Sequence, residues 1–179
     1  MDFTYKVNKN FQFLSEVQPL AHLNSLHTNI LKISIVTFLF EILNQVIQTE
    51  EVQEDLFLFL EESLLWLNNN DHISLFHCCF LLKLTAFLGC YPDFANPNFQ
   101  EFKNFSAKVY NTPIDKGFNK NQLFFLKRLL GINFDELRDV EVLKSERKEM
   151  LNQILTYYSF HVAGYKQPKS LPILEQVFS

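Results

Sequence analysis

The chain has 179 residues, the length of one globular domain. Hydrophobic residues make up 47% and include 20 phenylalanines, whereas glycine and proline number 4 and 6, so long helices are favoured over a turn-rich fold. A net charge of −4 excludes a surface that is basic throughout, as in proteins that neutralise many phosphates. Three cysteines, an odd number, with no signal peptide before them indicate a reduced, cytoplasmic protein.

The first 20 residues differ in pattern from the rest of the chain. Apolar and polar residues alternate over 3–7 and again over 11–13, and the intervening Asn-Lys-Asn at 8–10 is a good turn sequence. This pattern predicts a β-hairpin. A lone hairpin is marginal in water, so this one must pack on the remaining chain or belong to a sheet that the chain does not contain.

Helical periodicity predicts three helices between about residue 28 and residue 88. The first runs from about residue 28 to residue 46, with Ser25 or Thr28 as its cap, and the second from about residue 50 to residue 67. The third begins after Asp71 and ends near residue 88, where Gly89 and a later proline form a stop signal. Because lysine and glutamate interrupt the apolar runs at 30–47 and 76–88, we expect core helices and no membrane span.

A long irregular connection is predicted over 93–117. A fourth helix follows over about 119–130, with one more turn at 134–137. Ser145 is expected to cap a fifth helix that reaches about residue 162, and Ser170 to begin a short last helix that tolerates Pro172 in its first turn. The sequence therefore predicts a mainly α fold, a compact domain of about five or six helices behind a β-hairpin.

A cluster of His77, Cys78, Cys79 and Cys90 has the residue types of a metal site but not the spacing. Structural zinc sites show paired ligands such as C-x₂-C, twice. Neighbouring residues on a helix point about 100° apart, so the first three cannot share one face. We interpret the cysteines as small hydrophobes in or near the core and expect no metal or cofactor.

No catalytic motif stands out, neither a G-x-S-x-G elbow nor a phosphate-cradling glycine loop, so we expect no enzyme. Basic residues with interleaved aromatics occur over 120–128, as in single-strand binders. We favour an amphipathic helix there, with its phenylalanines in the core and its cations in solvent.

Three stretches together resemble one family: residues 30–68, which include FLFEIL and EEVQEDLFLFLEESLLWLN, then FLLKLTAFLGCYPDF at 80–94, and LNQILTYYSFHVAGYKQPKSLPILEQVF at 151–178. In order and spacing they are similar to the helical C-terminal part of the DNA repair protein RecO, most closely to Bacteroidetes-type members. The resemblance covers nearly the whole chain from about residue 5. No single motif is diagnostic.

The resemblance implies that residues 1–20 are a remnant of the family's N-terminal OB-fold, and that residues 21–179 are its helical C-terminal domain. The chain is then a truncated member or a fragment. It also implies a non-catalytic mediator of DNA repair and homologous recombination, which binds DNA, anneals strands, contacts the tail of single-stranded DNA-binding protein and works with RecR. DNA binding is expected to be weak without the OB-fold. A helical protein-interaction module with no DNA role is the alternative.

Two family features do not carry over to this chain. Many members hold a CxxC…CxxC zinc insertion after the segment that corresponds to 88–92, but residues 93–117 contain no cysteine. Some enterobacterial members have a basic pair where Cys78 and Cys79 stand, so a role of that pair in holding an acidic tail is not transferable.

A receptor for an acidic tail that ends in a phenylalanine carboxylate needs an apolar slot with a cation at its rim. Lys83, one turn before Phe87, is one candidate rim residue, and Lys127 with Arg128 is another. These four residues are the predicted partner-binding site, with solvated surface cations as the alternative interpretation.

Overall fold

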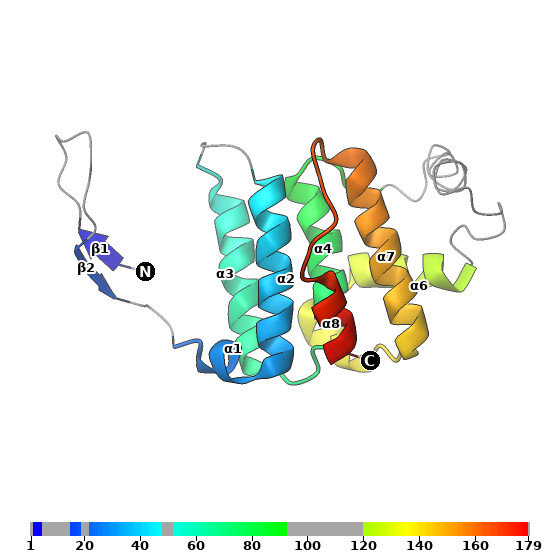
Figure 1. Ribbon diagram of the computed structural model, residues 1–179, viewed down its shortest axis with the longest axis horizontal. Coiled ribbons are helices and arrows are strands. Elements are labelled where there is room, and N and C mark those ends of the chain that lie inside the picture. The colour runs from blue at the N-terminus through cyan, green and yellow to red at the C-terminus, as the bar shows by residue number, and fades with distance from the viewer. Residues whose placement is uncertain (1, 5–14, 19–21, 48–51, 93–119, 179) are drawn as a thin grey trace.

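The computed structural model describes residues 2–4, 15–18, 22–47, 52–92 and 120–178 (Figure 1). Its elements in chain order are β1 (Asp2–Thr4), β2 (Ser15–Gln18), α1 (Asn24–Thr28), α2 (Ile30–Val46), α3 (Glu54–Asn69), α4 (Phe76–Phe87), α6 (Lys120–Gly131), the 3₁₀ helix η2 (Phe134–Asp139), α7 (Lys144–His161) and α8 (Leu171–Val177). The predicted mainly α fold is confirmed. All six predicted helices are present in the described ranges, where α1 and η2 bring the total to eight, more than the five or six expected.

The two strands pair antiparallel, with Asp2 opposite Gln18 and Thr4 opposite Ser15. The predicted turn at 8–10 lies outside the described residues, as does the predicted irregular connection over 93–117.

The start of α2 differs from the prediction, because Asn29 and not Ser25 or Thr28 caps it. The Asn29 side-chain oxygen accepts hydrogen bonds from the backbone N–H groups of Leu31, at 2.9 Å, and Lys32, at 3.4 Å. Thr28 lies inside α1, where its hydroxyl donates to the Asn24 carbonyl. The extended backbone of Asn29 ends α1 and begins α2, and one residue thus separates the two helices.

Helix α4 is the centre of the helical body and packs against α3, α6, η2 and α7. It is apolar around most of its circumference, and nine of its twelve residues are buried, as expected for a central helix. Cys78 and Cys79 are fully buried in the core, as predicted. The buried Tyr158 of α7 donates its hydroxyl to the Leu81 carbonyl at 2.7 Å. Gly89 has a φ of 69° and ends the helix as predicted, since this conformation favours glycine.

An aromatic cluster fastens η2 to one side of α4. The Trp66 indole lies parallel to the Phe76 ring, with centroids 5.6 Å apart, and its Nε1 donates to the Asp135 carboxylate at 2.6 Å. The Phe134 ring lies within 5.5 Å of both Trp66 and Phe76. Since these contacts span α3, α4 and η2, the cluster joins two consecutive helices to an element that is distant in sequence.

A buried lysine joins α2 to the end of α3. Lys32 is 2% exposed, and its ammonium donates to the Asn68 carbonyl at 2.9 Å. The carboxylate of Asp71 is 3.8 Å away but 96% exposed. The Asn68 side chain accepts from the Ser25 backbone N–H, so the end of α3 is tied to both α1 and α2. Across the described ranges, no helix is both long and apolar enough to cross a membrane.

Candidate functional site

The structure places two of the four predicted partner-binding residues against η2. The Lys83 ammonium stands 5.9 Å from the centre of the Phe134 ring, and the Arg128 guanidinium donates to the Asp139 carbonyl at 3.0 Å. Both cations thus contact η2. Phe87 stacks on Phe59, with centroids 5.0 Å apart, and is half-buried. Lys127 is exposed on α6.

The basic-aromatic segment of α6 departs in part from expectation. Phe124 is 61% exposed, whereas we predicted that the phenylalanines of this helix pack in the core. Leu126 and Leu129 face the core instead. Phe124 and Leu126 are two positions apart, which is about 200° around a helix, so one must point outward when the other points inward.

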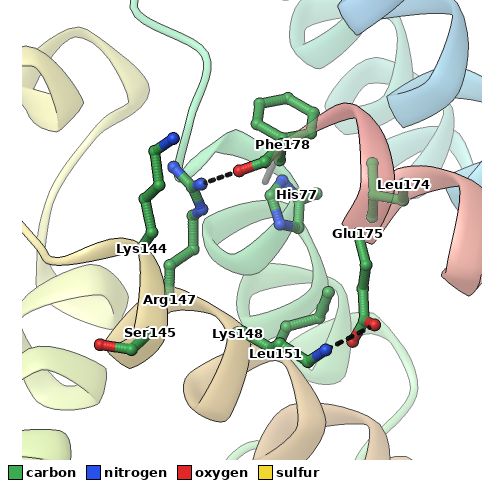
Figure 2. A pocket seen from close by; sticks show the side chains of 9 residues that line it. All are labelled: His77, Lys144, Ser145, Arg147, Lys148, Leu151, Leu174, Glu175 and Phe178. Atoms are coloured by element: carbon green, nitrogen blue, oxygen red, sulfur yellow. Dashed lines mark hydrogen bonds and ion pairs between the residues drawn. The ribbon is translucent and has the colours of Figure 1, made fainter.

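A cavity of about 250 Å³ lies between α4, α7 and α8 (Figure 2), and none of the four predicted residues lines it. We call it the basic cavity. Its apolar wall comes from Leu151, Leu174 and Phe178. Its polar lining consists of His77, Lys144, Ser145, Arg147, Lys148 and Glu175.

Three cations come from the first two turns of α7. Lys144, Arg147 and Lys148 are spaced i, i+3 and i+4, so they share one face of the helix. The helix macrodipole favours anions at this end, which means that three cations here do not serve helix stability. This spacing is a signal in the sequence that our prediction of site residues missed.

Arg147 and Lys148 each contact α8. Arg147 donates to the Phe178 carbonyl at 2.7 Å, and its guanidinium lies 5.3 Å from the centre of the Phe178 ring. Lys148 forms an ion pair of 2.8 Å with Glu175. Figure 2 shows these side chains pointing from α7 toward α8, with Lys144 at the edge of the group.

His77 closes the inner end of the basic cavity. The side chain is 2% exposed, its ring lies 5.6 Å from the Phe178 ring, and its Nδ1 has no hydrogen-bond partner. Burial, with the nearby Arg147 charge as a second cause, lowers the pKa of His77 to about 3. The imidazole is therefore neutral near pH 7, and Nδ1 is a polar atom still to be satisfied.

The basic cavity is suited to hold an anionic group that carries an apolar side chain. Cations line one side, apolar groups line the other, and an unsatisfied imidazole nitrogen stands at the inner end. It has no nucleophile paired with a base of suitable pKa. Burial raises the pKa of the neighbouring thiols Cys78 and Cys79, that of Cys79 to about 12, so both are neutral. Among the described residues, no three His, Cys, Asp or Glu side chains gather as a metal site would require.

Comparison with known proteins identifies a family model and relatives that match the chain. Residues 27–172 match the family model described as recombination protein O C terminal. The chain is 36% identical over 182 residues to the DNA repair protein RecO of Flavobacterium johnsoniae, an alignment that covers 100% of the chain and 75% of that protein. It is 33% identical over 179 residues to RecO of Flavobacterium psychrophilum, with the same coverage, and 27% identical over 186 residues to RecO of Bacteroides fragilis, where 97% of the chain and 74% of that protein align. No solved structure matches the chain.

Proposed function

The chain belongs to the recombination protein O family, and from that premise we propose that it is a non-catalytic mediator of DNA repair and homologous recombination. It acts in the cytoplasm through contacts with single-stranded DNA-binding protein and RecR. The antiparallel pair of β1 and β2 is the end of the family's OB-fold, and DNA binding by this chain alone is weak. The acidic net charge of −4 supports that last point.

The basic cavity is the first candidate receptor for the acidic tail of single-stranded DNA-binding protein. One observation carries this assignment: three cations on one face of α7 border an apolar cavity that ends in a buried imidazole with an unpartnered nitrogen. A terminal phenylalanine needs an apolar slot, and its carboxylate and the acidic residues before it need cations. The basic cavity offers both within one small site.

The surface formed by Lys83, Phe87, Lys127 and Arg128 is the second candidate receptor. Its support is that Lys83 and Arg128 both contact η2, and that the exposed Phe124 lies one turn before Arg128 on α6. Phe87 is already stacked on Phe59, however, which leaves less apolar surface for an incoming ring.

Anisotropy of a labelled peptide, a run of aspartates that ends in phenylalanine with a free carboxylate, separates the two candidates. Lys144→Glu reverses a rim charge of the basic cavity and should weaken binding about tenfold at low salt, or about 1.4 kcal/mol. Lys166→Glu makes the same charge change at an exposed position outside the cavity and is the matched control. Lys83→Glu tests the second surface. If Lys83→Glu weakens binding and Lys144→Glu does not, the receptor is at η2, and if neither does, the tail proposal is wrong.

Strand annealing tests the DNA role. We expect slow annealing of complementary strands by this chain and faster annealing once a complete OB-fold is supplied in the same polypeptide. A helical interaction module with no DNA role would show no annealing and no single-strand binding in either form, while it could still bind the peptide.

A further inference from the structure

Two cations at the edge of the basic cavity are already engaged by the chain itself. Glu175 at the end of α8 gives its carboxylate to Lys148 at 2.8 Å, and Phe178 gives its carbonyl oxygen and its ring to Arg147. The Phe178 ring also covers His77. Two of the three cations are thus engaged by an acidic residue and by a phenylalanine three positions later (Figure 2).

This arrangement reproduces the chemistry of the proposed ligand. An acidic tail that ends in phenylalanine would present a carboxylate to one cation, and an aromatic ring with a neighbouring oxygen to another. Glu175 and Phe178 present the same groups from within the chain. We propose that residues 175–178 are an intramolecular pseudo-ligand of the basic cavity, which the acidic tail must displace to bind. This inference rests on the proposed function.

The pseudo-ligand can leave while the first turn of α8 stays folded. Leu171 and Leu174 are buried and anchor the first turn of α8, and the Glu41 carboxylate accepts from the Ser170 backbone N–H and hydroxyl. Beyond Leu174 the helix end is held by the half-buried Phe178 and by the ion pair of Glu175 with Lys148. The side chains of Lys148 and Glu175 are 59% and 26% exposed, and an ion pair so open to solvent adds little stability.

The intramolecular pseudo-ligand lowers the apparent affinity of the basic cavity for the tail, because only molecules in which residues 175–178 have left can bind it. The double variant Glu175→Gln with Phe178→Ala removes the competing carboxylate and the competing ring, keeps the backbone carbonyl of residue 178, and leaves the cations of α7 in place. We expect it to bind the aspartate–phenylalanine peptide about three- to tenfold more tightly than the wild type. Ile173→Ala, at an exposed position of α8 that borders a different groove, is the matched control and should bind as the wild type does.

Amide hydrogen exchange supplies a readout that does not depend on the variant. The Phe178 N–H donates to the Leu174 carbonyl at 3.1 Å, and this bond should open when the pseudo-ligand is displaced. Saturating peptide should therefore speed exchange at Phe178, whereas the amides of the first turn of α8 stay protected.

The outcomes separate this inference from the proposed function. Tighter binding by the double variant with faster exchange at Phe178 supports both. A second outcome is that Lys144→Glu weakens peptide binding while the double variant binds as the wild type does or more weakly, or that exchange at Phe178 slows. This outcome supports the receptor and overturns the pseudo-ligand, because Phe178 would then be part of the cavity wall. No peptide binding by either form overturns the proposed function and the inference together.

Discussion

Acidification should destabilise the chain through His77. In the unfolded chain a histidine has a pKa of about 6.5, and in the folded chain burial, with Arg147 as a second cause, lowers the pKa of His77 to about 3. Between these two values the unfolded chain binds a proton that the folded chain excludes. Stability from this residue is thus complete above about pH 6.5 and falls as the pH drops toward 3.

The size of the effect follows from the two pKa values. Integrating the linkage relation from pH 7 to pH 5 gives a loss of about 2 kcal/mol from this one residue. A domain is stabilised by about 5–15 kcal/mol, so the loss is easily measured. Arg147 is the charged group that faces His77 from α7.

Urea unfolding at pH 7, 6 and 5 provides the test, with His77→Leu as the variant. Leucine fills the site beside the rings of Phe38 and Phe178 and cannot titrate. The unfolding free energy of the variant should fall by about 2 kcal/mol less than that of the wild type between pH 7 and pH 5. His72→Gln, at an exposed position, should keep the wild-type dependence. Equal losses in the wild type and His77→Leu would refute the reasoning.

Two further predictions concern buried hydrogen bonds and are measured by urea unfolding at pH 7. Tyr158→Phe removes the 2.7 Å bond to the Leu81 carbonyl and should cost about 1–2 kcal/mol, and no loss would mean that this bond adds nothing net. Lys32→Met removes the 2.9 Å bond to the Asn68 carbonyl and should cost about 1–3 kcal/mol. Asp71→Asn, which changes only the exposed partner 3.8 Å away, should cost less than about 0.5 kcal/mol, and an equal loss in both variants would mean that the ion pair matters more than the carbonyl.

Helical periodicity predicted the long helices because their apolar faces are set by local sequence. Helix α4 ends just before Gly89 as expected, since a positive φ after the last turn selects glycine. The five-residue α1 was missed because it is too short to show a period. The cap of α2 was misplaced because Ser25, Thr28 and Asn29 are all good caps, and only the end of α1 decides among them.

The basic cavity was beyond sequence reasoning for a different reason. The spacing of Lys144, Arg147 and Lys148 places them on one face of α7 from local information alone. Their meeting with His77 of α4 and Phe178 after α8 depends on tertiary packing that no local pattern encodes. The burial of Lys32 could not be predicted for the same reason. Polarity alone would place a lysine at the surface, and the Asn68 carbonyl that accepts its hydrogen bond is 36 positions away.

The position of Trp66 makes it an intrinsic fluorescence probe. It is the single tryptophan of the sequence, and its indole is held against Phe76 and Phe134 with its N–H on Asp135. Its emission therefore senses the packing of η2, on which Lys83 also rests. A ligand at η2 should shift that emission, whereas a ligand in the basic cavity, which Trp66 does not line, should leave it nearly constant. The unlabelled chain can in this way tell which of its two candidate surfaces is occupied.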